Sequence, residues 1–212
     1  MLQGYVKLLL EWNKKINLIS RKDEDQIWIR HVLGSIALLF QFEFLPHTTL
    51  IDVGTGGGLP GIPLGILSDN LDVTLVDSIQ KKIRAVTEII ESLKLERMKT
   101  VCGRIEEINR VRPHHHAFDY VIARAVGSIS DIVKWSIPLL KPAPATPPVE
   151  APSQRKRLGR GSIILLKGGD LTGELEQARL KHEPREIASY PVIIDGIDPS
   201  ELVGKKIVII RP

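Results

Sequence analysis

The hydrophobic positions near the N-terminus recur with the spacing of amphipathic helices. The first such segment carries apolar side chains at Tyr5, Leu8, Leu9, Trp12 and Ile16. A second helix is predicted after Ser20, with Asp23 as its N-cap and an apolar stripe over 27–39. Gly34 lies inside this helix and costs roughly 1 kcal/mol relative to alanine if the helix is continuous. We therefore expect residues 1–47 to form a helical cap ahead of the first strand.

From residue 48 onward the pattern changes to short apolar runs separated by amphipathic segments. The runs predicted as strands are 49–53, 72–77, 99–103, 117–123, 161–168, 186–194 and 205–211. The helices predicted between them are 78–95, 128–140 and 172–182. Strands that alternate with helices imply an α/β fold with a mostly parallel, seven-stranded sheet covered on both faces. The last two strands imply an antiparallel edge.

One segment, at about 141–160, departs from this alternation. Its prolines at 142, 144, 147, 148 and 152 are followed by Arg155, Lys156, Arg157 and Arg160. Such a composition is incompatible with regular structure, so we expect a mobile insertion between a helix and the next strand. The chain is then a single domain, 1–212, with the cap at 1–47 and a core at 48–212 that carries the insertion.

The composition is that of an ordinary soluble domain. Of the 212 residues, 43% are hydrophobic and 25% are charged, and no apolar run is long enough to cross a bilayer. The N-terminus has neither a basic leader nor a cleavage site, so no secretory signal is expected. Cys102 is the only cysteine, which excludes an internal disulfide, fits a reducing cytoplasm and is expected in the core.

The remaining composition bears on partners. The histidines at 114–116 are expected in an exposed loop rather than around a metal, because adjacent side chains cannot all face one ion. The net charge of +4 is mildly basic and compatible with nucleic acid. We expect a cytoplasmic monomer without a bound metal and without membrane association.

The strongest candidate for chemistry is a glycine-rich turn after the first predicted strand. It follows Asp52 and contains Gly54, Gly56, Gly57, Gly58 and Gly61. Gly56, Gly58 and Gly61 match the G-x-G-x-x-G fingerprint of dinucleotide binding. Asp52 with the first, second and fourth glycines matches acid-x-G-x-G-x-G, the pattern of S-adenosylmethionine (SAM) binding in Rossmann-like methyltransferases. Asp77, at the end of the next strand, is suited to bind ribose hydroxyls in either case, so an adenosine-containing ligand is predicted and both cofactors remain open.

The fourth predicted strand is followed by Arg124, at the sheet edge where chemistry gathers in open α/β folds. Neither an acid–Pro–Pro–aromatic run, typical of enzymes that methylate exocyclic amines, nor a cysteine nucleophile follows this strand. Guanine N7 carries no proton, so direct in-line attack from that atom on a methyl sulfonium needs no general base. Arg124 is therefore the catalytic candidate, acting by positioning and electrostatics on a phosphate, the guanine edge or the methionine carboxylate. Its structural alternative is an ion pair with Glu106 or Glu107.

These motifs, in this order, resemble the bacterial GidB (RsmG) family of SAM-dependent guanine-N7 methyltransferases of small-subunit (16S) ribosomal RNA. The matching stretches are WNKKINLIS at 12–20, RHVLGS at 30–35, IDVGTGGGLPGIPL at 51–64, LVDSIQKKI at 75–83, GRIEEI at 103–108, FDYVIARAV at 118–126 and LLKGG at 165–169. The resemblance implies a Rossmann-like class I SAM-dependent methyltransferase fold. It also implies SAM contacts at Gly54, Leu59, Ile105, Glu106 and Arg124, with Asp77 and Ser78 in the ribose-binding corner.

The predicted partner is small-subunit rRNA, presented either as RNA or as the 30S particle. The candidate RNA-binding residues are Arg30, His31, Lys167, Arg155, Lys156 and Arg157. The family's second motif usually carries an aspartate where this chain has Gly34, so that carboxylate is missing here. Two other functions remain open, an NAD-dependent oxidoreductase and a non-catalytic SAM-binding protein that associates with the ribosome.

Overall fold

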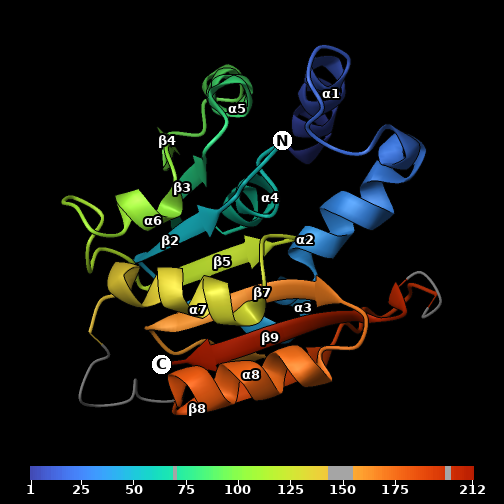
Figure 1. Cartoon of the computed structure of the whole chain (residues 1–212). Helices are drawn as coiled ribbons and strands as arrows, with labels where there is room; N and C mark the ends of the chain where they lie inside the picture. The colour runs from blue at the N-terminus through green and yellow to red at the C-terminus, as the bar shows by residue number, and fades with distance from the viewer. Residues whose placement is uncertain (69–70, 143–154, 199–201) are drawn as a thin grey trace.

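The computed structural model describes residues 1–68, 71–142, 155–198 and 202–212, and its centre is a seven-stranded sheet (Figure 1). The strand order is β4-β3-β2-β5-β7-β9-β8. The bounds are β2 (Thr48–Val53), β3 (Leu71–Asp77), β4 (Met98–Cys102), β5 (Tyr120–Arg124), β7 (Ser162–Gly168), β8 (Glu186–Pro191) and β9 (Lys205–Arg211). β2, β3, β4, β5 and β7 are parallel, whereas β9 runs antiparallel to both of its neighbours. The predicted α/β sheet with an antiparallel edge is confirmed.

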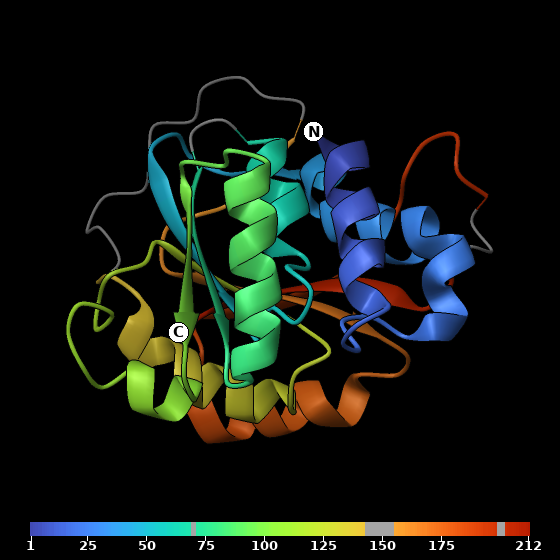
Figure 2. The same cartoon turned by 90° about the horizontal axis from the view of Figure 1, so that it is seen from above.

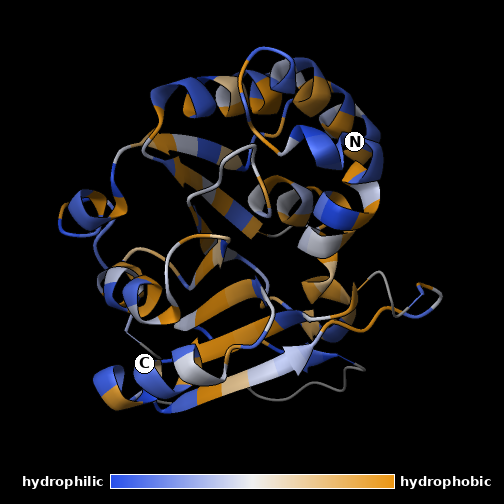
Figure 3. Ribbon diagram, turned by 45° about the vertical axis from the view of Figure 1, so that its right-hand side comes forward, coloured by the Kyte–Doolittle hydropathy of each residue, from blue (hydrophilic) through white to orange (hydrophobic). Residues whose placement is uncertain are grey.

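Helices cover both faces of this sheet, because its central strands are apolar on both sides. One face carries α4 (Gly61–Ile66), α5 (Gln80–Ser92) and the N-terminal segment, and the other carries α6 (Ile105–Ile108), α7 (Ile129–Ser136) with η3 (Ile137–Leu139), and α8 (Thr172–His182) (Figures 1 and 2). Along β5, Ile122 packs into the first core and Val121 into the second. Figure 3 shows the resulting concentration of apolar residues along the strands.

The N-terminal cap differs from the two regular helices that were predicted. α1 (Leu2–Asn13) forms as expected, but the second helix is divided into the 3-10 helix η1 (Arg21–Gln26), the π-helix η2 (Trp28–Leu33), α2 (Gly34–Ile36) and α3 (Leu38–Gln41). The prediction of Asp23 as an N-cap is wrong, because its carboxylate binds Arg30 and His31 instead. The carboxylate is therefore engaged by side chains of η2 and does not cap η1.

Buried polar side chains fasten the cap to the glycine loop. Asn13 Oδ1 accepts hydrogen bonds from the backbone N–H groups of Leu18 (2.8 Å) and Ile19 (3.0 Å), which fixes the turn after α1. The Tyr5 hydroxyl donates to the Gly57 carbonyl at 2.9 Å. Burial raises the pKa of Tyr5 well above its usual value, so the hydroxyl remains a donor. Asn13, Leu18 and Ile19, all from the stretch WNKKINLIS, therefore shape the turn that covers the glycine loop.

A separate two-stranded sheet joins the cap to the end of the insertion. β1 (Phe42–Glu43) pairs in parallel with β6 (Lys156–Arg157), so irregular structure throughout 141–160 was wrongly predicted for these residues. The predicted mobile segment and its prolines at 144, 147, 148 and 152 lie outside the described residues. Its described flanks meet at one carboxylate, since buried Asp119 forms ion pairs with Lys141 (2.8 Å) and Arg160 (3.2 Å).

Three smaller expectations concern the cysteine, the three histidines and membrane-spanning helices. Cys102 is exposed at the end of edge strand β4, so its predicted place in the core is wrong. The histidines at 114–116 lie in a loop as predicted, with His115 and His116 exposed and their Nδ1 atoms near backbone carbonyls, but His114 is half-buried and stacks on Phe118. Among the described helices, none has both the length and the apolar content needed to cross a bilayer.

Candidate active site

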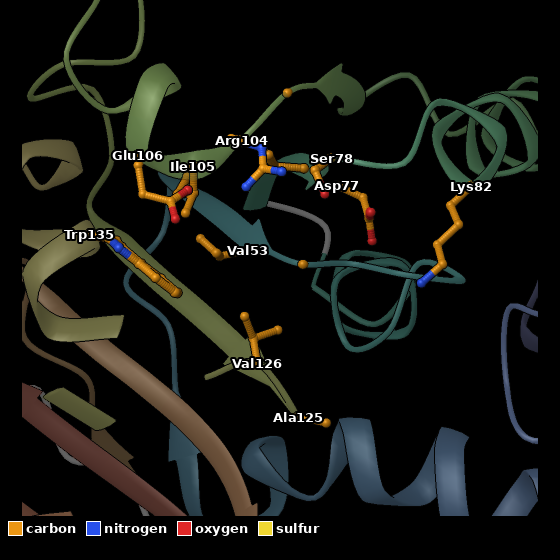
Figure 4. Close-up of a pocket in the computed structure, with 13 residues that line it drawn as sticks. Val53, Asp77, Ser78, Lys82, Arg104, Ile105, Glu106, Ala125, Val126 and Trp135 are labelled. Carbon is orange, nitrogen blue, oxygen red and sulfur yellow. The ribbon is translucent and has the colours of Figure 1, made fainter. Parts of the chain in front are cut away.

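A cleft of about 330 Å³ opens at the carboxyl ends of β2, β3, β4 and β5, between the loops that follow these strands (Figure 4). It is lined by Val53, Gly54, Val76, Asp77, Ser78, Lys82, Gly103, Arg104, Ile105, Glu106, Ala125, Val126 and Trp135. Open α/β sheets bind their ligands at this edge. The structure therefore brings Gly54, Asp77, Ser78, Ile105 and Glu106 together out of the predicted cofactor residues.

Gly54 forms the wall of the cleft where two loops meet. Its φ of +70° lies in the left-handed region, and a Cβ atom there would lie 2.4 Å from Val126 Cγ2. Only glycine allows the loops after β2 and β5 to approach this closely. Gly56, Gly58 and Leu59 do not line the cleft, and Gly58 instead packs against Ile62 in α4.

Asp77 orders the cleft from the end of β3. Its Oδ2 accepts a hydrogen bond from the Gly56 N–H at 3.0 Å, and its Oδ1 accepts one from the Ile79 N–H at 2.9 Å. The carboxylate thus holds the glycine loop against the loop that begins α5. Each oxygen has further acceptor capacity, which two ribose hydroxyls can use.

Asp52 lies beneath the glycine loop and not in the cleft. Its Oδ2 accepts hydrogen bonds from the Thr55 hydroxyl (2.6 Å) and the Gly61 N–H (2.9 Å), while its buried Oδ1 has no hydrogen-bond partner among the described residues. Burial raises the pKa of Asp52 to about 6, although these two bonds and the charge of Arg124 oppose the shift. This carboxyl group joins β2 to the start of α4.

The raised pKa predicts a specific pH dependence. Between about 3.8 and 6 the folded state binds more protons at Asp52 than the unfolded state does, so the contribution to stability is present below pH 4 and lost as the pH rises through 6. Asp52→Asn keeps an oxygen for Thr55 and Gly61 and removes this titration. We expect the free-energy difference between variant and wild type to change by at most about 3 kcal/mol from pH 4 to pH 8, in favour of the variant at pH 8. Denaturant unfolding at both values measures it, and an unchanged difference would contradict the assignment.

Sequence reasoning missed several cleft residues, among them Lys82, Arg104, Val126 and Trp135. Trp135 reaches the cleft from α7, where in sequence it is one more apolar position of a helix. Its ring lies on the same side as Val53, Ile105 and Glu106, whereas Asp77 and Ser78 lie across from it (Figure 4). A largely apolar wall that carries one carboxylate, opposite Asp77, fits the adenosine of SAM, with the base on the apolar side and the ribose at Asp77.

Arg124 turns from the end of β5 toward the cap and does not line the cleft. Its Nη2 lies 3.0 Å from His31 Nδ1, and its Nη1 donates to the His31 carbonyl (3.4 Å) and the Ser35 hydroxyl (3.5 Å). In the described part of the chain it forms no ion pair, so the alternative pairing with Glu106 or Glu107 is absent. Burial lowers the pKa of Arg124 from its usual value. A half-buried guanidinium with neutral acceptors is suited to receive an anionic group.

The predicted RNA-binding residues do not lie together. Arg30 is exposed on η2 and pairs with Asp23 at 2.6 Å, His31 lies inside the cap, and Lys167 pairs with Glu174. Arg155, Lys156 and Arg157 lie at the amino end of the sheet, away from the cleft, because Leu158 accepts a hydrogen bond from Tyr120 at the start of β5. There Arg157 pairs with Glu43, and Lys156 lies over the ring of Tyr190.

Comparison with known families gives a match over most of the chain. A model of the GidB family, described as rRNA small subunit methyltransferase G, matches residues 1–146. A ribosomal RNA small subunit methyltransferase G from Flavobacterium johnsoniae is 39% identical over 165 residues, which cover 78% of this chain and 71% of that protein. A protein of the same name from Chlorobaculum tepidum is 35% identical, with 100% of this chain and 88% of that protein covered.

Solved structures extend the match to the fold. A SAM-dependent methyltransferase from Aquifex aeolicus has a TM-score of 0.57 at 14% identity and covers 90% of this chain and 94% of its own. A predicted O-methyltransferase from Agrobacterium tumefaciens also has a TM-score of 0.57, at 13% identity, and covers 85% of this chain and 79% of its own. At these identities the likeness concerns the fold alone, which is the predicted class I methyltransferase fold.

Proposed function

We propose that this chain, which belongs to the GidB family of rRNA small subunit methyltransferase G, transfers a methyl group from SAM to N7 of a guanine in small-subunit rRNA. The family assigns the cofactor and the class of enzyme: the chain is a SAM-dependent methyltransferase. This cofactor sets the NAD-dependent alternative aside, and we propose that the cleft beside the glycine loop holds SAM. The choice of guanine N7, the in-line attack and the monomeric state are our proposals.

The choice of N7 is supported by the groups that follow β5. Arg124, Ala125 and Val126 offer no proton acceptor, because an arginine side chain remains protonated in proteins. Two carboxylates line the described cleft. Asp77 is engaged by two backbone N–H groups, and Glu106 lies on α6, which follows β4 and not β5. An acceptor without a proton suits such a site, and guanine N7 is one. The attack then needs alignment and no proton transfer.

Different residues of the chain bind the cofactor and supply the positive charge. SAM, when bound, supplies a methyl group on a positively charged sulfur. Gly54, Asp77, Ile105 and Trp135 surround the place of its adenosine, while Arg124 supplies a positive charge below the cap. That charge suits the methionine carboxylate or an RNA phosphate. His31, which contacts Arg124, and the exposed Arg30 next to it remain the RNA-binding candidates on the cap.

Nucleoside mass spectrometry tests the proposal. The protein is incubated with saturating SAM and with 30S subunits that lack the modification, and in parallel with naked rRNA. We expect 7-methylguanosine in at least one substrate, and the comparison identifies which one is used. A different methylated nucleoside would overturn the choice of N7 and keep the methyltransferase. If no methyl group is transferred to either RNA while SAM binds, the non-catalytic alternative is favoured.

A further inference from the structure

Three side chains from three separate elements form a hydrogen-bonded chain below the cap. Asp23 in η1 contacts His31 in η2, with Oδ2 at 3.3 Å from Nε2, and His31 contacts Arg124 at the end of β5, with Nδ1 at 3.0 Å from Nη2. The His31 side chain is only 13% exposed. It is therefore the link between the cap and the sheet at this point.

The chemistry of arginine determines the protonation state of His31. A guanidinium has donors and no acceptor, so the contact at 3.0 Å requires that Nδ1 of His31 carry a lone pair. A neutral imidazole with a free Nδ1 carries its proton on Nε2, which can then donate to the Asp23 carboxylate. Asp23 thus selects the tautomer that can accept a hydrogen bond from Arg124.

Charges around the imidazole favour the same state. Arg124 from β5 and Lys205 from β9 lower the pKa of His31, after the larger effect of burial, and Asp23 with its hydrogen bond opposes them. Arg30, on the same helix as His31, binds the other oxygen of Asp23 at 2.6 Å. At neutral pH His31 is therefore neutral and able to accept. Protonation at lower pH would place an N–H against Arg124.

We propose that His31 is a positioning residue for Arg124, held in the accepting tautomer by Asp23, so that the guanidinium keeps its orientation and its charge remains available to an anionic group. A carboxylate in place of the imidazole would orient Arg124 equally well but would neutralise it. An imidazole orients it without neutralising it, which is the property that an anion-binding arginine requires. The inference rests on the role proposed for Arg124.

Substitutions that copy one ring nitrogen at a time test the proposal. The amide oxygen of His31→Asn can occupy the place of Nδ1, whereas His31→Gln reaches toward Asp23 and His31→Ala removes both contacts. We expect His31→Ala and His31→Gln to lower kcat/KM for methyl transfer by about tenfold or more, and His31→Asn to retain activity within about threefold of wild type. His114→Asn, at the amino end of the sheet, is the matched control and should behave as wild type.

NMR spectra and the pH profile of activity distinguish a positioning role of His31 from a role in stability. The NMR spectra also test the inference independently of the proposed function. In nitrogen NMR spectra, wild-type His31 is expected as the Nε2–H tautomer, and the Arg124 guanidinium N–H signals should stay resolved in His31→Asn but average in His31→Ala. These signals need no RNA, so they remain decisive even if no 7-methylguanosine is formed. Activity of wild type should fall on the acid side as His31 protonates, and His31→Asn should lose that part of the pH profile. An Nδ1–H tautomer, or equal activity of the alanine and asparagine variants, would overturn the proposal.

Discussion

Replacing Arg124 by alanine is expected to lower kcat/KM for methyl transfer by about 10²- to 10³-fold, the usual effect of removing one preorganised electrostatic contact. The substitution leaves the strand intact, because the backbone of β5 is hydrogen-bonded on both sides by β2 and β7. A charge held away from water without an ion-pair partner is itself unfavourable, so its removal should change the free energy of unfolding little. Activity should therefore be lost while the unfolding midpoint changes little. Methyl-transfer kinetics and thermal unfolding measure the two effects.

A conservative substitution and a distant one make the result for Arg124 specific. Arg124→Lys keeps the charge but not the planar fork that reaches His31 and Ser35 together, so its activity should lie between wild type and alanine. Arg97→Ala breaks an exposed ion pair with Asp72 at the other end of the sheet, and we expect activity within about twofold of wild type. Full activity of Arg124→Ala would remove this residue from the site.

Replacing Gly54 by alanine is expected to weaken SAM binding and to destabilise the fold. At φ +70° an alanine is strained by about 1–3 kcal/mol, and its Cβ would lie 2.4 Å from Val126 Cγ2. The loop after β2 or the loop after β5 must move, and both line the cleft. We expect SAM affinity by calorimetry to fall at least about tenfold, as a shift of 1.4 kcal/mol would give.

Two companion variants separate the steric clash with Val126 from the backbone strain at Gly54. Val126→Ala removes the colliding methyl group, so Gly54→Ala/Val126→Ala should recover the steric part of the loss and not the part due to backbone strain. Gly173→Ala is the matched control, because Gly173 lies in α8 with no atom within 4 Å of an added Cβ. Because Gly173 is the second residue of α8, the gain in the free energy of unfolding should be at most about 0.5 kcal/mol, and SAM affinity should be unchanged. Unaltered SAM affinity in Gly54→Ala would contradict this view of the cleft.

The strands were predictable because each is a short apolar run between turns, and burial on both faces leaves little else that such a run can form. The second cap helix was not predictable in detail. Ile27 and Val32 of its apolar stripe are buried, but Trp28 is exposed. The segment is divided into η1 and η2, and Asp23 in η1 contacts Arg30 and His31 in η2. β6 was missed because its pairing with β1 joins residues more than 110 positions apart, within a segment of turn-forming composition.

The same distinction applies to the site. The proposed site residues Gly54, Asp77 and Arg124 could be found in sequence, because a glycine or a charge at the end of a strand is unusual there. Trp135 could not, since an apolar residue on an amphipathic helix is an ordinary core position until the helix is placed. The structure also places Asp52 beneath the loop and Arg155 and Lys156 far from the cleft, although all three resemble site residues in sequence.

The sequence by itself determined the α/β sheet, the glycine loop, the acid at the end of β3 and the arginine at the end of β5, because each depends on local periodicity or on a residue type that few conformations require. Only the tertiary structure decided the direction of Arg124, the contacts of His31 with Arg124 and Asp23, and the close approach of Gly54 to Val126. These features depend on which atoms meet across separate elements. These contacts depend on how the cap packs on the sheet and on how the loops after the strands approach one another, and no local pattern in the sequence predicts them.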